Sequence, residues 1–454
     1  MTNRSSISSS RSSSITSSTI HVVVIGGSYG GVACVNKLQH GLLKDSNVAI
    51  TLIESRDARH HCIASYRALV QKDFAKNLWI PYTNLFPKTS PHKVVQGTVQ
   101  NIFHDHVLLS SDKPISSSDI TDPWRIDFDY LVIATGSMVP SPAKWKVDSA
   151  AEGLRLLEKT QEDIKQSERI VIVGGGACGV EMAGELKYAF PSKSVTLIHQ
   201  ASDLVNYPKF PQSFKDHTRR YLESYGVEVI LNERADIPGL SRENSVQKAE
   251  RTIRLKGSGR TIQSDLQFFS IGMSVDTSLL STLLPAGEES GKFDYNSILD
   301  PKTKAIRVKS TLQLDHNAFP RMFAIGDVSK ADPVPTCMSA VAAGETSARN
   351  IIKLIHREEK RRARRGIEDE EDEHKDTDDE DADDERDGYI CRSWNRLEDY
   401  VPIRPQMVIA MNPIGGVCHL PVVGTWFGGI AAWLVKSGDL FSGRFWREMN
   451  MPRP

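Results

Sequence analysis

Short apolar runs alternate with glycine-rich turns and helical stretches along most of the chain. Residues 21–25 lead into GGSYGG at 26–31, and residues 169–173 lead into GGGACG at 174–179. An apolar stretch with helical spacing follows each turn. β-branched runs bounded by glycine predict buried strands, and their alternation with helices predicts parallel α/β units. We therefore expect two strand–turn–helix units, 148 residues apart.

Further apolar runs extend this pattern. Six of them predict strands, at residues 48–53, 128–134, 194–198, 267–271, 305–314 and 322–325. Two of these runs end in glycine in the same manner, at Thr135-Gly136 and at Gly272. The last two predict strands that return to the first sheet, so the chain leaves its first domain and comes back.

The predicted fold class is α/β, with a second nucleotide-binding domain inserted in the first and a small C-terminal α+β segment. The predicted bounds are a serine-rich disordered tail (1–19), the first domain (20–142 and 300–354), the second domain (143–299), a charged disordered linker (355–388) and a C-terminal domain (389–454).

The first glycine turn has the composition of a dinucleotide fingerprint. Its first glycine permits the bend, its second position lets the backbone approach a pyrophosphate, and its third lets helix and strand pack closely. Gly26, Ser28 and Gly31 occupy these places, with Gly27 and Gly30 between them, and Ser28 departs from the pattern. The next predicted strand ends in Glu54, a carboxylate able to accept hydrogen bonds from ribose hydroxyls.

The second glycine turn keeps all three glycines, Gly174, Gly176 and Gly179. An acidic residue after the following strand favours NAD and an arginine favours NADP, but His199 stands there and decides neither. Glycine turns also occur in ordinary α/β packing; two such turns in matching contexts favour two bound dinucleotides. A nicotinamide donor facing a flavin is the usual reason for such a pair.

Gly326-Asp327 follows the last predicted strand. An aspartate at the carboxyl end of a buried strand is suited to bonding a ribitol chain, although a plain turn has the same composition. A stretch of small residues at 335–344 predicts a helix that packs closely beside this turn.

The spacing of the cysteines and the distribution of charge disfavour two classes of function. The six cysteines include no CxxC or CxxxxC pair, which disfavours a reductase that shuttles disulfides. Fifteen acidic residues lie between Glu368 and Asp387, so the rest of the chain is basic, with 54 cationic and 42 anionic side chains. That body suits phosphate-bearing cofactors or an anionic membrane surface. Nucleic-acid binding through the basic stretch at 360–365 is disfavoured, because the adjoining acidic run competes for its arginines.

The two ends of the chain leave alternatives open. The tail is rich in serine and arginine, as in mitochondrial transit peptides, but its apolar residues are too few for an amphipathic face, which favours disorder. Thr2 excludes N-myristoylation. The uncharged run at 420–435 is too short and too interrupted to span a membrane, and predicts core packing, a dimer surface or an interfacial anchor. As a helix it would place Trp426, Ile430, Trp433 and Leu434 on one face.

With these motifs in view, the sequence resembles the apoptosis-inducing-factor-like flavoproteins, most closely those of the ferroptosis-suppressor type, within the pyridine nucleotide-disulphide oxidoreductase superfamily. The resemblance rests on these stretches: HHCIASYRALV, ATGS, IVIVGGGACGVEMAGELK, VTLIH, FAIGD and LVKSGDLFSGRFWREM. The last is the most discriminating, because generic nucleotide binding does not need it.

The resemblance implies two Rossmann-like, glutathione-reductase-like domains that hold FAD and NAD(P)H. It implies a quinone-type acceptor and a cytoplasmic location, with peripheral contact at a membrane or mitochondrion, and it leaves room for a homodimer through the C-terminal domain. No metal is expected. By matching position, the resemblance assigns Gly26, Gly31, Glu54 and Asp327 to FAD, and Gly174, Gly176, Gly179 and Glu181 to NAD(P)H. The other candidate cofactor-binding residues are Gly27, Ser28, Gly30, Arg67, Thr135, Gly136, His199, Gly272 and Gly326.

Glu181, Arg67 and His61 are the candidate catalytic residues. Glu181 lies just past the second fingerprint, on the side of the nicotinamide, although an acid at a helix start also suits the helix dipole. Arg67 is expected to pair with Glu181 or to stabilise a reduced anionic flavin. His60 and His61 are expected to line the acceptor pocket.

The predicted function is that of an FAD-dependent NAD(P)H:quinone oxidoreductase. One alternative is an NADH-sensing flavoprotein that turns over weakly and regulates cell death through partner binding. The other is a non-catalytic scaffold that uses its charged tract.

Overall fold

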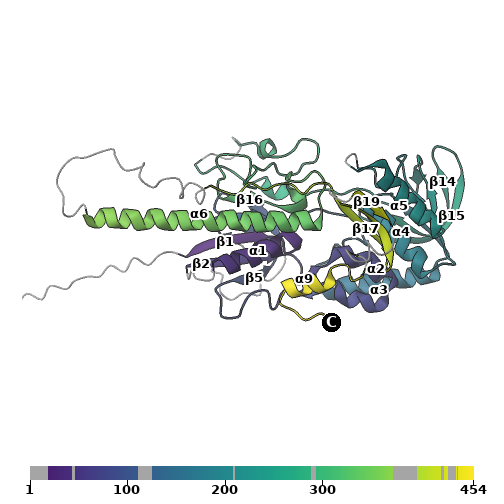
Figure 1. Cartoon of the computed structure of the whole chain (residues 1–454), viewed down its shortest axis with the longest axis horizontal. Helices are drawn as coiled ribbons and strands as arrows, with labels where there is room; N and C mark the ends of the chain where they lie inside the picture. Colours follow the sequence, from purple (N-terminus) through teal and green to yellow (C-terminus); the bar gives the residue numbers. More distant parts are fainter. Residues whose placement is uncertain are drawn as a thin grey trace, which may run out of the picture.

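The computed structural model of the chain describes residues 19–42, 47–110, 125–207, 210–287, 293–371, 396–420, 424–427, 436 and 438–454. All but the last residue of the predicted tail at 1–19 lie outside these residues. Most of the charged run also lies outside them, as do Ile430, Trp433 and Leu434. Figure 1 shows two α/β bodies side by side, one around β1 and one around β15, with the C-terminal strands against the second and α9 near the first.

A five-stranded parallel sheet is the centre of the first body. Its order is β16–β9–β1–β2–β5, and the strands are β1 Ile20–Ile25, β2 Val48–Glu54, β5 Lys93–Gln96, β9 Tyr130–Ile133 and β16 Met322–Ala324. Ile25 pairs with both Ile53 and Ile133, so the ends of three strands meet at one edge. The chain returns to this sheet through β16 after it has built the second sheet.

Alternating side chains of β1 divide the first core into two layers. Val22 and Val24 pack under α1 (Tyr29–Gly41) and α6 (Cys337–Glu371). Val23 and Ile25 pack on the other side, against a small antiparallel sheet of β6 Val99–Ile102, β7 His106–Leu109 and β8 Arg125–Asp127. The first glycine turn is thereby held between a packed strand and a packed helix.

The second body has a six-stranded sheet in the order β12–β11–β10–β15–β14–β13. Its first four strands run parallel, while β14 and β13 are antiparallel to their neighbours. The strands are β10 Arg169–Val173, β11 Ser194–Ile198, β12 Glu228–Ile230, β13 Ala235–Asp236, β14 Val246–Leu255 and β15 Thr261–Phe269, and the helices are α3 Ala150–Gln166, α4 Ala177–Ala189 and α5 Gln212–Ser224. Together the two sheets confirm the predicted α/β class with two Rossmann-like units.

The C-terminal segment contacts both bodies. Its sheet of β17 Met407–Asn412, β18 Gly415–Leu420 and β19 Gly424–Phe427 packs on α4, where a Cβ on Gly184 would lie 2.4 Å from the carbonyl oxygen of Met411. The short helix α9 (Ser442–Glu448) binds the first body: Asn36 donates to the Glu448 carbonyl at 2.8 Å, and Arg59 pairs with the Glu448 carboxylate at 3.3 Å. Residues of α2 Ser65–Val70, β3 Ala58–His60 and β4 Trp79–Pro81 pack into the same core as those of α4 and β17.

Two predicted elements are wrong. Residues 305–314 form isolated bridges rather than a strand, because the chain reverses at Leu312, whose φ is 68°. Trp426 lies in strand β19 rather than on a helical face.

The start of the predicted linker is also different. Helix α6 continues unbroken to Glu371, so the first part of that charged segment is helical, since it consists largely of strong helix formers. Figure 1 shows α6 running past α1 and on beyond the strands of the first sheet. Among the described helices, none combines the length and apolarity needed to cross a bilayer.

The closest approach of α1 and α6 yields a stability prediction. A Cβ on Gly344 would lie 2.3 Å from the carbonyl oxygen of Gly30, which is backbone and cannot yield. Gly344→Ala should therefore cost about 1–3 kcal/mol of unfolding free energy, despite the better helix propensity of alanine. Thermal unfolding of the purified protein measures this.

Gly41→Ala is the matched control in the same helix pair. There the added Cβ would lie 2.4 Å from Cδ1 and 3.4 Å from Cγ1 of Ile352, and the end of this side chain is able to move aside. Equal unfolding temperatures for the two variants would contradict the backbone contact.

Candidate functional site

The two glycine turns are built alike. Gly26 and Gly174, the first glycine of each, have positive φ angles of 102° and 121°, which favour glycine. A Cβ on Gly31 would lie 1.8 Å from the Gly26 carbonyl oxygen, and one on Gly179 would lie 1.9 Å from that of Gly174. In each turn the strand end and the helix start therefore touch through backbone alone.

Both helices that follow begin without a side-chain cap. Ser28 is the N-cap of α1 and Gly176 that of α4, and neither forms a side-chain capping hydrogen bond. The first backbone N–H groups of these helices are thus available to an anionic ligand, and the helix dipole favours one.

A cavity of about 260 Å³ lies over the first turn. It continues into one of about 220 Å³, and the two share Gly26, Glu54 and Thr135. Most residues expected to hold FAD line the first of these: Gly26, Gly27, Ser28, Gly30, Glu54, Thr135, Gly136, Gly326 and Asp327. Gly31 lies beneath the turn instead.

Two carboxylates flank this cavity. Glu54 is buried at the end of β2, where Oε2 accepts from the Gly27 N–H at 2.7 Å. Asp327 accepts from the Ser137 hydroxyl at 2.6 Å, with the Lys144 ammonium 4.0 Å away. Each carboxylate retains acceptor capacity for hydroxyls of a sugar or polyol.

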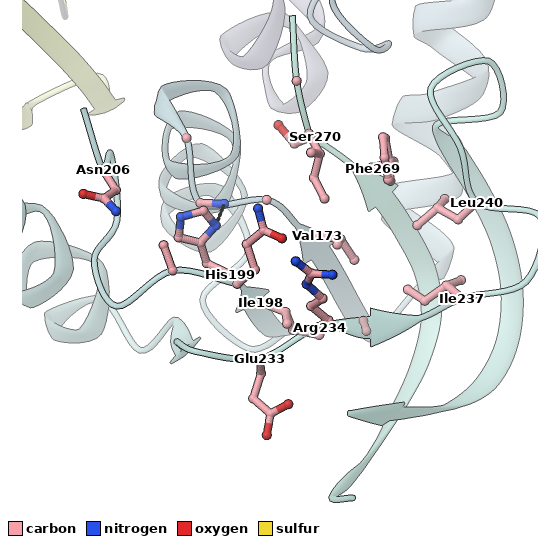
Figure 2. Close-up of a pocket in the computed structure, with 18 of the residues that line it drawn as sticks. Val173, Ile198, His199, Asn206, Glu233, Arg234, Ile237, Leu240, Phe269 and Ser270 are labelled. Atoms are coloured by element: carbon pink, nitrogen blue, oxygen red, sulfur yellow. Dashed lines mark hydrogen bonds between the residues drawn. The ribbon is translucent and has the colours of Figure 1, made fainter. Parts of the chain in front are cut away.

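A larger cavity of about 530 Å³ lies over the second turn. Gly174, Gly176, His199 and Gly272 line it. The Nδ1 of His199 accepts from the Gly175 N–H at 3.1 Å, and burial lowers the pKa of this histidine, so its ring is neutral near pH 7. Figure 2 shows the ring facing the cavity beside the glycine turn.

A third cavity of about 610 Å³ joins the other two. It shares Ile63, Val139, Pro335, Thr336 and Cys337 with the first cavity, and Gly176, Tyr207, Ser270 and Gly272 with the second. Most of its wall is apolar and includes Val334, Met338, Met407, Val408, Leu420 and Phe441. Among the described residues that line it, only Glu181 and Lys436 are charged.

Glu181 is paired, but with a residue that the sequence did not indicate. Its Oε1 accepts from the Lys436 ammonium and, at 3.2 Å, from the Ala410 N–H. Lys436 also donates to the Val408 carbonyl at 3.2 Å. The C-terminal segment thus supplies the cation that faces the third cavity.

Arg67 does not pair with Glu181, contrary to expectation. Its Nε donates to Oε1 of Glu185, one helical turn further along α4, at 2.7 Å, and both side chains are 2% exposed. Burial raises the pKa of Glu185 to about 7, against the opposing effect of the Arg67 guanidinium. Arg67 lines none of the three cavities, so this pair lies behind the wall.

The two histidines lie in different places. His60 lines the first cavity and stacks on Trp79, with the ring centroids 4.5 Å apart. His61 is fully buried, with Nδ1 bonded to the Tyr29 hydroxyl at 3.0 Å and Nε2 to the Leu440 carbonyl at 2.9 Å. Burial lowers the pKa of His61 to about 3. His61 lies behind the cavities, where its two hydrogen bonds connect α1 to the C-terminal segment.

Lys436 and Arg234 line these cavities, and the sequence reasoning did not single them out. Lys436 stands within the LVKSGDLF stretch, and a lysine directly after the uncharged run at 420–435 was the available signal. Arg234 follows the third strand of the second sheet, and no local motif marks it.

A family model described as pyridine nucleotide-disulphide oxidoreductase matches residues 20–347. Apoptosis-inducing factor homolog B of Dictyostelium discoideum is 26% identical over 454 residues, which cover 97% of this chain and 99% of that protein. Ferroptosis suppressor protein 1 of Xenopus laevis is 26% identical over 444 residues, which cover 96% and 97%. These relatives confirm the resemblance found in the sequence.

A solved structure supports the fold. The sulfide:quinone oxidoreductase from Aquifex aeolicus superposes with a TM-score of 0.55 at 20% identity, over 75% of this chain and 78% of that chain.

The second turn yields a prediction with an internal control. Gly179→Ala should destabilise the protein strongly, because its Cβ would overlap the Gly174 carbonyl. Gly176→Ala meets no atom within 4 Å and should leave the unfolding temperature unchanged. Since Gly176 lines the second and third cavities, its variant should weaken nicotinamide nucleotide binding by about tenfold.

Thermal unfolding and nucleotide titration distinguish the two effects. A Gly179→Ala protein as stable as the parent would contradict the described turn.

The Arg67–Glu185 pair yields a pH prediction. Because the pKa of Glu185 is raised from 4.5 to about 7, the folded state binds this proton more tightly than the unfolded state, and stability falls as pH rises through that window. Glu185→Gln has no proton to lose. Its stability relative to the parent should therefore rise between pH 5 and pH 8, by up to about 3 kcal/mol.

Denaturant unfolding at intervals between those two pH values measures the difference. Glu158→Gln, on the exposed side of α3, is the control for removal of one carboxylate. A difference between the Glu185→Gln variant and the parent that stays constant with pH would show that the pKa of Glu185 is not raised.

Proposed function

The chain belongs to the pyridine nucleotide-disulphide oxidoreductase family, and on that premise we propose that it oxidises NAD(P)H and passes the electrons to a quinone. It is an oxidoreductase whose cofactors are FAD and NAD(P)H. When bound, FAD supplies the redox chemistry, accepting hydride from NAD(P)H and giving up two electrons to the acceptor.

The first cavity fits FAD. Gly27 lines this cavity, and a Cβ there would lie 2.5 Å from the Tyr82 hydroxyl, so the turn fits against Tyr82 only as glycine backbone. The uncapped start of α1 is suited to the pyrophosphate, Glu54 to ribose hydroxyls and Asp327 to the ribitol chain. The second cavity, with the uncapped start of α4, would hold the nicotinamide nucleotide.

The apolar third cavity carries the proposal. It adjoins both nucleotide cavities, and a single ion pair interrupts its apolar wall. A quinone has an apolar ring and two carbonyl oxygens, which matches an apolar space with one strong donor. Lys436 is placed to donate to a carbonyl oxygen, while the apolar wall excludes water.

The Lys436–Glu181 ion pair would also deliver a proton, because the reduction of a quinone consumes more protons than NAD(P)H supplies. A quinone takes up two electrons and two protons to become a hydroquinone, whereas NAD(P)H supplies two electrons and one proton. The second proton must come from solvent. Lys436 and Glu181 are the charged groups among the described residues of the cavity wall, and the proton would pass through them.

The cysteine spacing and one structure of the same fold support a quinone as the acceptor. No CxxC or CxxxxC pair is present to take electrons to a disulfide. The Aquifex aeolicus protein, which has the same fold, is named a sulfide:quinone oxidoreductase. The cytoplasmic location, the peripheral membrane contact and the homodimer remain predictions.

Anaerobic stopped-flow mixing tests the two half-reactions. NAD(P)H should bleach the flavin absorbance, and a short-chain quinone should restore it faster than oxygen does. Lys436→Gln should slow the second step about 100-fold or more while the bound flavin is retained, because it removes the donor and the proton path.

Lys302→Gln, an exposed lysine in a distant turn, removes the same charge and should leave both steps unchanged. Parent enzyme that is reduced normally but is not reoxidised by quinones would refute the quinone as acceptor.

A further inference from the structure

The end of β11 has no carboxylate facing the second cavity. In dinucleotide folds an acid after this strand holds the ribose hydroxyls of NAD and repels the 2′-phosphate of NADP. His199 and Gln200 stand there instead, and the pKa of His199 is lowered by burial. The usual obstacle to a 2′-phosphate is therefore missing.

A cation reaches the same edge from the neighbouring strand. β11 and β12 are adjacent and parallel, and the loops that follow them are joined by backbone hydrogen bonds. The His199 N–H donates to the Ile230 carbonyl at 2.8 Å, and the Glu233 N–H donates to the His199 carbonyl at 3.1 Å. Arg234, the next residue, is thereby fixed beside His199 at the cavity.

The one carboxylate among the residues that line this cavity is turned away. Glu233 accepts from the backbone N–H groups of Gly257 and Ser258, at 2.8 and 2.6 Å. Figure 2 shows its side chain pointing away from His199, while Arg234 points inward between Ile198 and Val173. The acid next to Arg234 in the sequence thus stabilises a loop and does not neutralise the guanidinium.

Arg234 has no competing acceptor. Within the described part of the chain, its guanidinium forms neither an ion pair nor a hydrogen bond. Beyond it, Ile237, Leu240 and Phe269 give the cavity an apolar end suited to an adenine ring. A phosphate on the adenosine ribose would lie between this apolar end and the glycine turn, which is the position of Arg234.

We infer that Arg234 selects a nucleotide that carries a 2′-phosphate, so that NADPH rather than NADH is the preferred electron donor. This inference rests on the proposed function only in that the second cavity holds the nicotinamide nucleotide. It is independent of the acceptor.

Binding of two adenosine fragments tests the inference without turnover. Adenosine 2′,5′-bisphosphate and adenosine 5′-monophosphate differ by the 2′-phosphate alone, and calorimetry on the FAD-loaded protein measures both. The parent should bind the bisphosphate at least tenfold more tightly, since an Arg–phosphate contact is a charge-assisted pair. This preference should shrink as ionic strength rises.

Three variants sharpen the test. Arg234→Gln should abolish the preference and leave binding of the monophosphate unchanged. Arg220→Gln, an exposed arginine on α5 outside the cavity, removes the same charge and should keep the preference. His199→Glu restores an acid at the end of β11 and should reverse the preference.

The outcomes separate this inference from the proposed function. Equal affinities for the two fragments in the parent, or a preference that survives in Arg234→Gln, would overturn the role of Arg234 and leave the quinone reaction untouched. Failure of both fragments to bind would overturn the assignment of the second cavity, and with it both proposals.

Discussion

The whole arrangement depends on a contact with no side chains, the one between the first and last glycines of each turn. A carbonyl oxygen lies where any Cβ on Gly31 or Gly179 would have to be. This contact sets the start of a helix directly against the end of a strand, leaving bare N–H groups at the sheet edge. Neighbouring parallel strands end at the same edge, so Glu54 and His199 arrive there as a consequence.

A second level of organisation comes from charges buried around α4. Glu181 and Glu185 lie one helical turn apart on that helix, and each takes its cation from a different part of the chain, Lys436 from the C-terminal segment and Arg67 from α2. Loss of one partner would strand a charge in the interior, which typically costs 3–5 kcal/mol. The two pairs thus fix the position of α4 relative to both segments while exposing one of them to the third cavity.

The sequence predicts those site residues that belong to short local motifs, and it does not predict those that reach the site through tertiary packing. The glycine turns, Glu54 and Asp327 belong to short motifs at strand ends, and their places at the sheet edge follow from strand order. Lys436 and Arg234 reach their cavities only through tertiary packing, which no spacing reveals. Arg67 was expected to pair with Glu181 but pairs with Glu185, one helical turn further along α4. Both glutamates lie on the same face of α4, and only the packing of α2 decides which of them Arg67 meets.

The C-terminal segment has a consequence for the order in which the protein becomes competent. It provides Met407, Val408 and Lys436 to the third cavity and anchors α9 on the first body. These residues leave the ribosome after both Rossmann-like units are complete, and domains generally fold as they emerge. The two sheets and their glycine turns are therefore made before the third cavity has its C-terminal wall. That wall is the last part of the site to be synthesised.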